Sequence, residues 1–146
     1  RKMVTVESLR EVGLFGDLSE EILTEIAGMA SFKAFEDGEL VYQLGDDAKD
    51  LYLVDSGRIR FSMGIGNRPK ASGSTMVPGN LFGWAALLEE QPRRVATASC
   101  LEGSTLYVIP SDKLLELFAN NKAAGYSVMR RLATMIAHDF MSVLSV

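Results

Sequence analysis

The 146-residue chain is poor in the side chains from which most catalytic centres are built. It has one cysteine, Cys100, and one histidine, His138. A single cysteine excludes an internal disulfide, and a single histidine excludes metal sites built on several imidazoles. No nucleophile with a neighbouring base can be assembled from the sequence, so a small β-barrel enzyme is disfavoured. We expect no enzymatic activity, no resident metal or cofactor, and a small buried thiol at Cys100.

Long apolar runs and an excess of positive charge are also missing. No apolar stretch approaches the roughly 18 residues of a membrane-spanning helix. The N-terminus lacks the apolar segment of a secretion signal, so we expect a cytoplasmic protein that does not engage a membrane. The net charge is −4, which predicts no binding of nucleic acid by this chain alone. The hydrophobic content of 47% is enough for one domain with a core.

Helical patterns occupy both ends of the chain. Within residues 1–30, Ser19 can cap a helix that opens with two acidic residues and continues at helical apolar spacing. Residues 6–15 predict a shorter helix before it. Residues 111–146 predict two further helices, the first capped by Ser111 and the second running from about residue 123 to the end.

The segment between the helical ends, residues 31–110, has the pattern of short strands separated by glycine turns. This pattern predicts a mainly β domain, an antiparallel β-roll or jelly roll flanked by helices. Residues 64–74 contain three glycines and a proline and predict a mobile hairpin loop. Residues 95–101 and 105–109 predict the last two strands.

The final helix carries an apolar stripe wide enough to pack on a partner helix. Its members are Met129, Leu132, Ile136, Phe140 and Val143. Two uses are open, a homodimer seam and packing on the roll of the same chain, and different faces can serve both. Gly125, near the start of this helix, is a candidate hinge.

The segment 79–98 combines a turn glycine, Gly83, a short helical stretch and two arginines. The start of a helix offers unpaired N–H groups, and an arginine adds a planar fork of donors suited to phosphate. We therefore expect a pocket for a small phosphorylated ligand, and we expect Leu87 and Leu88 to be core residues.

Arg93 and Arg94 have a second interpretation, in which they form a surface pair answered by Glu89 and Glu90. Adjacent residues of a strand face opposite sides, so at most one of the two arginines points inward.

The order of these elements resembles the cyclic nucleotide-binding domain of the catabolite-activator and Fnr-type (Crp/Fnr-like) regulators. The same domain occurs in protein kinase A regulatory subunits and in cyclic nucleotide-gated channels. The resemblance covers nearly the whole chain and is carried by five segments in order: 35–39 (FEDGE), 44–46 (LGD), 51–60 (LYLVDSGRIR), 79–83 (GNLFG) and 94–98 (RVATA). It implies a regulatory domain of a transcriptional regulator or signalling protein. Such a domain would bind cAMP, cGMP or a related small anion, signal through its C-terminal helix and form a homodimer.

The resemblance also implies a set of ligand-binding residues: Phe82, Gly83, Trp84, Ala85, Ala86, Arg93, Arg94, Val95, Met135 and Ile136. The family's phosphate-binding arginine maps onto Arg93 when matched from Pro92 and onto Arg94 when matched from the following Ala-Thr pair. We favour Arg94, because strand register slips less readily than loop length.

Four residues depart from the family pattern. Trp84 stands where the family usually has the Glu that takes the ribose 2′-hydroxyl. Val95, after the arginine, supplies no donor. Met135 and Ile136 are apolar where relatives often present a polar residue to the base. Trp84 is therefore either an aromatic wall for a different ligand or a plug, and a plugged pocket would leave a non-binding dimerisation or scaffold module.

Overall fold

The computed structural model describes residues 2–63 and 71–144 as two sheets and a set of helices. The helical elements are α1 (Val6–Arg10), η1 (Gly13–Phe15), α2 (Glu20–Met29), η2 (Trp84–Leu87), α3 (Ser111–Asn120) and α4 (Lys122–Leu144). The strands are β1 (Ser31–Phe35), β2 (Leu40–Tyr42), β3 (Asp50–Ser56), β4 (Ile59–Ser62), β5 (Ala71–Met76), β6 (Leu81–Phe82), β7 (Thr97–Cys100) and β8 (Ser104–Pro110).

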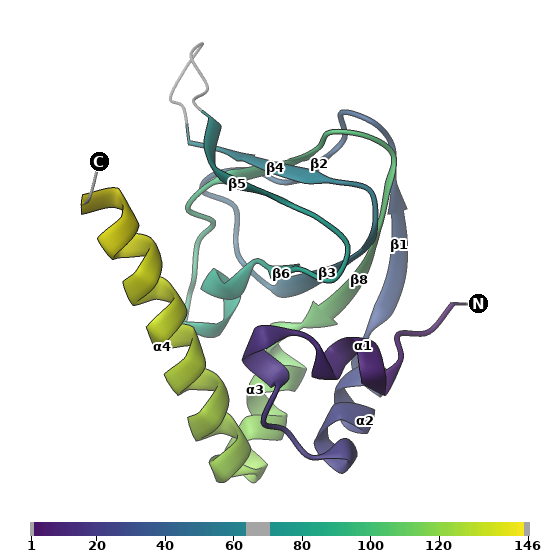
Figure 1. Cartoon of the computed structure of the whole chain (residues 1–146), viewed down its shortest axis with the longest axis vertical. Coiled ribbons are helices and arrows are strands. Elements are labelled where there is room, and N and C mark those ends of the chain that lie inside the picture. The colour runs from purple at the N-terminus through teal and green to yellow at the C-terminus, as the bar shows by residue number, and fades with distance from the viewer. Residues whose placement is uncertain (1, 64–70, 145–146) are drawn as a thin grey trace.

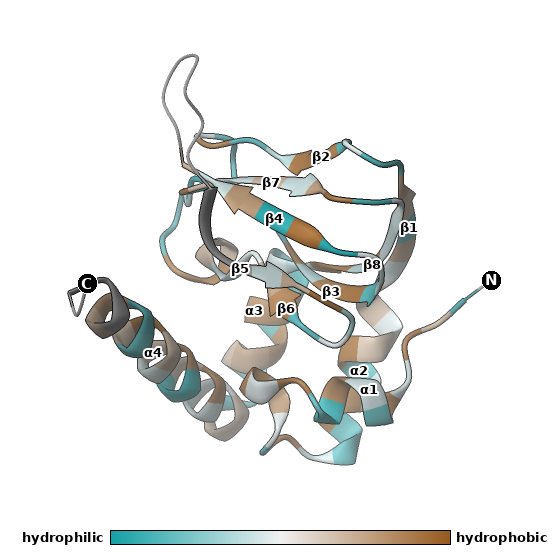
Figure 2. Ribbon diagram, turned by 45° about the horizontal axis from the view of Figure 1, so that its top comes forward, coloured by the Kyte–Doolittle hydropathy of each residue, from teal (hydrophilic) through white to brown (hydrophobic). Residues whose placement is uncertain are grey.

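The strands form two antiparallel four-stranded sheets, in the orders β1-β8-β3-β6 and β2-β7-β4-β5. Figure 1 shows the two sheets facing each other as a roll, with α1, α2 and α3 gathered at one end and α4 running along one side. The predicted β-roll with flanking helices is confirmed. Hydrophobic and hydrophilic positions alternate along β4, as expected for a strand with one buried face (Figure 2).

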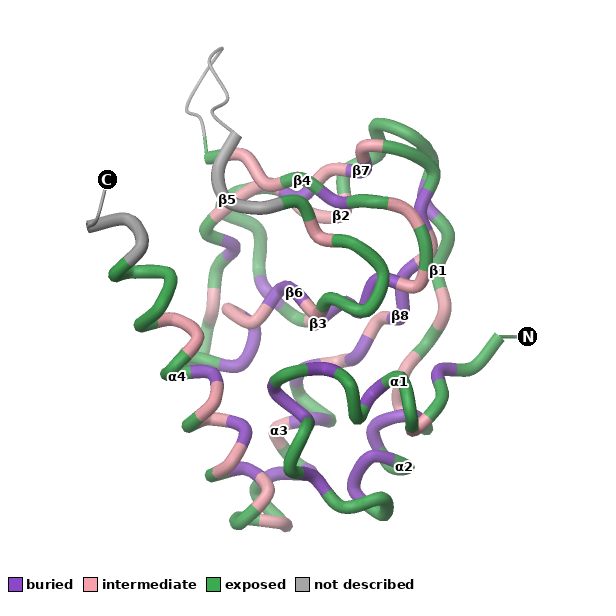
Figure 3. The backbone as a smooth tube through the Cα atoms, viewed as in Figure 1, coloured by how far each residue is buried: buried purple, intermediate pink, exposed green. Residues whose placement is uncertain are grey.

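The strands β3 and β8 separate two apolar cores. Along β3, Leu51 and Leu53 pack with the helices, whereas Tyr52 and Val54 pack inside the roll. Because successive side chains of a strand point to opposite faces, a strand covered on both sides is buried throughout. Figure 3 shows this burial in β3 and β8 and in the parts of the helices that face them. The second core, inside the roll, also receives Phe82 and Cys100, which confirms Cys100 as a buried free thiol.

Of the two serines expected to cap helices, Ser19 does so and Ser111 does not. Ser19 caps α2 as predicted, because its hydroxyl oxygen accepts from the backbone N–H of Ile22 at 3.2 Å. Ser111 does not cap α3. It is the first helical residue, after Pro110, and its hydroxyl donates to the carbonyl of Lys49 at 2.8 Å.

Other predicted boundaries also need correction. The single helix expected over 6–15 is divided, because α1 ends at Arg10 and the 3₁₀ turn η1 follows. Of the loop expected at 64–74, residues 71–74 belong to β5, and residues 64–70 lie outside the described residues. The strand expected over 95–101 begins at Thr97. Leu87 is buried, but Leu88 follows the end of η2 and is 50% exposed, so it is not a core residue.

The helix α4 is attached to the body through its first half. Val128 and Leu132 are buried in the helical core. Gly125 lets the helix approach α3 closely, since a Cβ there would lie 2.9 Å from the Cβ of Phe118. The described residues contain no helix that is both long and apolar enough to cross a membrane.

Gly57, in the turn between β3 and β4, allows a stability prediction. Its φ is +92°, and a Cβ there would lie 2.7 Å from the Cα of Ser104. Gly57→Ala should therefore lower the free energy of unfolding by about 2 kcal/mol or more, measured by urea denaturation. Gly28→Ala is the control, because nothing lies within 4 Å of its added Cβ and alanine is the better helix former. Equal stability of the two variants would contradict the argument.

Candidate functional site

Arg94 lies inside the roll, with only 3% of the residue exposed. Its Nη1 donates to the carbonyl of Gly83 at 3.0 Å, and its Nη2 donates to the carbonyl of Asp50 at 2.7 Å. Its backbone N–H donates to the backbone carbonyl of Asp46, and its backbone carbonyl accepts from the N–H of Gly45, both at 2.8 Å. The guanidinium is therefore held in place by the end of β6 and the start of β3, and the backbone by the turn before β3.

Aromatic rings surround the Arg94 guanidinium. Its central carbon lies 4.1 Å from the centroid of the Tyr42 ring and 5.7 Å from that of Tyr52. Phe82 stacks on Tyr52 at 5.2 Å, and Phe61 meets Phe82 edge-on at 5.6 Å. A cation over the face of an aromatic ring is favourable, particularly away from water. The interior of the roll is thus a cluster of rings around one positive charge.

One donor in this cluster has no acceptor. The Nε of Arg94 is the one buried side-chain polar atom without a hydrogen-bond partner among the described residues. A buried donor left unpaired costs about 1–3 kcal/mol. An acceptor that reached this atom inside the roll would recover that free energy.

The same burial shifts the pKa values of nearby groups. Burial raises the pKa of Tyr42 to about 12, against a smaller opposing effect of the Arg94 charge. Burial also raises the pKa of Tyr52 and of the Asp50 carboxyl, and Arg94 again acts in the opposite direction. The aromatic hydroxyls therefore stay neutral at physiological pH, and Arg94 provides the positive charge inside the roll.

Arg93 points the other way. Its Nη1 lies 2.8 Å from Oδ1 of Asp47 and 3.4 Å from the carbonyl of Gly45, and its side chain is 64% exposed. The two arginines face opposite sides, as the alternation of side chains along a strand predicts. They lie outside the named strands, and the backbone of Arg93 forms an isolated antiparallel β-bridge with that of Asp47. The second interpretation, a surface pair answered by Glu89 and Glu90, is wrong, because Arg94 is buried and the partner of Arg93 is Asp47.

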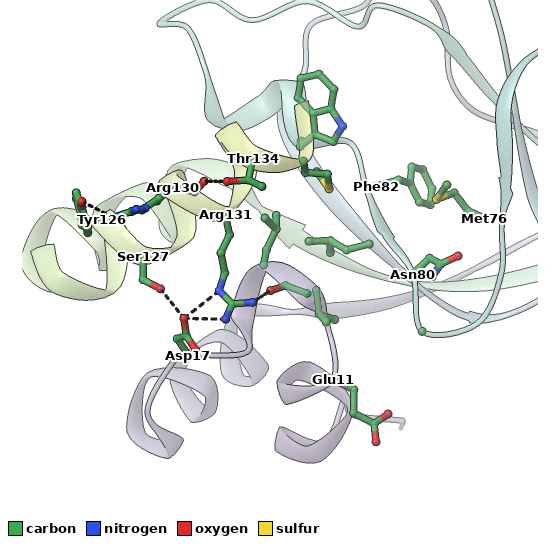
Figure 4. Close-up of a pocket in the computed structure, with 17 residues that line it drawn as sticks. Glu11, Asp17, Met76, Asn80, Phe82, Tyr126, Ser127, Arg130, Arg131 and Thr134 are labelled. Atoms are coloured by element: carbon green, nitrogen blue, oxygen red, sulfur yellow. Dashed lines mark hydrogen bonds and ion pairs between the residues drawn. The ribbon is translucent and has the colours of Figure 1, made fainter. Parts of the chain in front are cut away.

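The indole of Trp84 belongs to the helical core and not to the cluster around Arg94. It lines a groove of about 880 Å³ between α4, the η1 segment and the end of β6. Met135 of α4 lines the same groove, whereas Phe82 contributes to both the groove and the roll interior. Figure 4 shows α4 and the η1 segment on two sides of this groove.

The remaining predicted site residues are divided among different surroundings. Ala85 and Ala86 belong to η2, and the N–H of Ala86 already donates to Gly83 at 3.2 Å. Val95 is 58% exposed, and Ile136 is half-buried against the helical core. The structure thus brings Phe82, Gly83 and Arg94 together in the roll, and Trp84 and Met135 together in the groove.

Sequence reasoning missed three residues that hold Arg94: Tyr42, Tyr52 and Asp50. The alternation along β3 could have placed Tyr52 inside the roll, opposite Leu51 and Leu53. Asp50 contributes its backbone carbonyl, and no side-chain pattern signals that contact.

Comparison with known proteins identifies the family of this chain. Residues 32–121 match the family described as cyclic nucleotide-binding domain. The chain is 25% identical over 138 residues to the regulatory protein HlyX of Actinobacillus pleuropneumoniae, covering 94% of this chain and 57% of that protein. It is 27% identical over 133 residues to the cyclic AMP receptor protein of Thermus thermophilus, covering 90% and 55%.

A solved structure supports the same assignment. The regulatory domain of Toxoplasma gondii PKA, crystallised with cAMP, superposes with a TM-score of 0.71 at 28% identity, covering 83% of this chain and 45% of that one. The chain therefore belongs to the cyclic nucleotide-binding domain family and is a regulatory domain of the Crp/Fnr and PKA-regulatory type. It spans just over half the length of the two curated relatives.

The partly buried phenol of Tyr42 predicts a pH dependence. An unfolded tyrosine ionises from about pH 10, whereas Tyr42 in the fold has a pKa of about 12. Between these values the unfolded state releases the proton first, so stability falls as the pH rises from 10 to 12. In Tyr42→Phe this fall should be smaller by on the order of 2 kcal/mol, measured by urea denaturation across that range. Tyr126→Phe, at an exposed ring, is the control, and identical pH slopes for both variants would contradict the prediction.

Proposed function

We propose that this chain is a sensor domain that acts by binding a small anion, with cAMP or cGMP as the leading ligands. The observation that carries the proposal is Arg94, a cation inside the roll with one buried donor unpaired. Phosphate oxygens are the strongest acceptors available to a guanidinium, because the resulting hydrogen bonds are charge-assisted. In this proposal the phosphate accepts a hydrogen bond from the Nε of Arg94. It also competes with the carbonyls of Gly83 and Asp50 for the hydrogen bonds that Nη1 and Nη2 donate.

The output of the proposed sensor passes through α4. Trp84 follows directly after Gly83, whose carbonyl accepts from Arg94, and the indole faces the same groove as Met135 of α4. A ligand that draws Arg94 away from Gly83 therefore acts on the residue beside the α4 groove. If α4 can dock against the groove in more than one position, such a ligand favours the position to which it binds more tightly. The size of the shift is set by the difference in its affinity for those positions.

The ligand proposal is tested by isothermal titration with cAMP and cGMP. Arg94→Ala should weaken binding about 10- to 100-fold, the usual effect of losing hydrogen bonds to a charged group. Arg93→Ala is the matched control and should change the affinity less than about twofold, because Arg93 is exposed and paired with Asp47. An affinity of Arg94→Ala within about twofold of the wild type would contradict the assignment of the phosphate to Arg94.

A second candidate function is a dimerisation or scaffold module that binds no nucleotide. The observation that favours it is the filled interior, in which Tyr42 lies against the guanidinium of Arg94 and two carbonyls take its outer donors. Absence of heat in the titration, together with an unchanged melting temperature at millimolar nucleotide, would select this function over the sensor.

We also propose a homodimer formed through α4. Tyr126, Ala133 and Phe140 are exposed at seven-residue spacing on this helix, the repeat of a two-helix seam. Tyr126 is 66% and Phe140 60% exposed, so both rings are available to a partner helix.

The dimer is tested by light scattering after gel filtration. Phe140→Glu should convert the wild-type dimer to a monomer, because two carboxylates would face each other across the seam. Leu88→Glu makes a similar change at an exposed site away from α4 and should leave the mass unchanged. A monomeric wild type, or a dimeric Phe140→Glu protein, would exclude this seam.

A further inference from the structure

Arg94 is the one charged residue that is buried among those that the structure describes. The buried polar residues beside it in that part of the chain are Ser104 and Ser111. The Ser104 hydroxyl donates to the carbonyl of Glu102 at 2.9 Å, and the Ser111 hydroxyl donates to that of Lys49 at 2.8 Å. Of these three side chains, only Arg94 keeps a donor without a partner, at Nε. A ligand inside the roll would therefore meet one cation, and the buried serine hydroxyls are already engaged.

A single buried cation suits an anion of charge −1 better than a dianion. The second charge of a dianion would have no counter-ion in an interior of low polarity, and burying an unpaired charge is costly. The half-buried Asp50 carboxyl interacts electrostatically with Arg94, and it would repel additional negative charge. A carboxylate has one charge and two oxygens, which match the planar fork of a guanidinium. The charges of the site therefore favour a monoanion such as a carboxylate.

The walls around the Arg94 guanidinium are aromatic. Besides their contacts with the cation, the rings of Tyr42 and Tyr52 meet at 5.9 Å between centroids, and Phe82 lies 6.2 Å from Tyr42. A flat ring can take the place of another ring in such a cluster, whereas a hydroxyl-rich group would be buried without hydrogen bonds. The other buried side chains of this core offer little polarity: Phe35, Val54, Ile59, Ala98, Cys100 and Leu106.

Tyr42 is the ring that an entering ligand can displace at the lowest cost. It is half-buried on β2, a three-residue strand at the edge of its sheet with β7 as its neighbour (Figure 2), and the register shifts between Leu40 and Tyr42. Tyr52, in contrast, lies on β3, which pairs with β6 on one side and β8 on the other. Because fewer backbone hydrogen bonds hold an edge strand, local movement there is easier.

We propose that the roll binds aromatic monoanions, with a carboxylate or similar group on Arg94 and a flat ring in the place of the Tyr42 ring. Tyr42 is then the residue that determines specificity, because its ring already fills the position that the ligand ring takes. The ligand class rests on the proposed function, since it requires an anion at Arg94. It narrows that function to anions that carry a ring close to the charge and few hydroxyl groups.

Benzoate is the probe for this ligand class, and two carboxylates of the same charge are its matched controls. Cyclohexanecarboxylate lacks the flat ring, and in isothermal titration it should bind about fivefold more weakly than benzoate. Gallate keeps the ring but adds three hydroxyl groups, and it should bind about tenfold more weakly, because those hydroxyls are buried without partners. Equal affinities for the three carboxylates, or a preference for gallate, would overturn the proposal.

The variant Tyr42→Ala tests where the ring of benzoate lies. Removal of the Tyr42 ring leaves space for one ring beside the guanidinium, so benzoate should bind about tenfold more tightly than to the wild type. Benzoate should also raise the melting temperature of this variant by more than that of the wild type. Tyr126→Ala removes an exposed ring and should match the wild type. Benzoate affinity that is unchanged or weaker in a cooperatively melting Tyr42→Ala protein would contradict the assigned position.

A measurement on the wild-type protein does not depend on the folding of any variant. The Nε–H signal of Arg94 should move in proton–nitrogen NMR spectra as benzoate is added, because this donor gains a charged acceptor. The Nε–H signal of the exposed Arg93 is the internal control and should stay in place. An Arg94 signal that does not move at saturating benzoate would overturn the proposal, whatever the affinities are.

The same NMR signal, followed during a titration with cAMP, separates the ligand class from the proposed function. If cAMP moves the Arg94 signal and benzoate does not, the sensor function stands and the ligand class is wrong. If benzoate moves it and cAMP does not, the ligand class stands and the nucleotide is excluded as the ligand. If neither moves it, both proposals are rejected.

Discussion

The buried guanidinium of Arg94 organises the roll. A charge removed from water must be met by hydrogen bonds or opposing charge, and here backbone carbonyls and aromatic faces meet it. The carbonyl of Gly83 lies after β6 and that of Asp50 at the start of β3, so one side chain connects two strands of one sheet with the segment that precedes β7. Removing this side chain would leave both carbonyls and the Tyr42 ring without their common partner.

The second constraint is the boundary between the two cores. Because β3 and β8 are covered on both faces, the short segment after β6 crosses from one core to the other within a few residues. Phe82 packs in the roll, Gly83 turns the chain with φ +88°, and Trp84 packs with the helices. A glycine suits this turn because a positive φ is strained for other residues. The groove beside α4 and the interior of the roll are therefore joined through Gly83.

The predictable parts of this chain are those set by local spacing. Strand alternation and glycine turns predict the roll, and Ser19 predicts the start of α2 from its own side chain. The opposite orientations of Arg93 and Arg94 follow from the same alternation. Contacts between distant segments leave no local pattern, which is why the Asp50 carbonyl and the Arg131–Asp17 pair went unforeseen. The direction of Trp84 also escaped prediction, because it depends on a 3₁₀ turn that packs against the helical core.

The closed interior and a binding function are compatible on energetic grounds. Without a ligand, each outer nitrogen of Arg94 donates to one neutral carbonyl and the Nε has no partner, so two neutral hydrogen bonds and the aromatic faces hold the buried charge. An anion would replace neutral acceptors by a charged one, which roughly doubles the strength of each bond. Against this gain, the Tyr42 ring 4.1 Å from the guanidinium must shift or share the cation. In the proposed complex the affinity would be set by the balance between the charge-assisted bonds and the contact with Tyr42, and a planar ligand group stacked on the displaced ring would recover part of that contact.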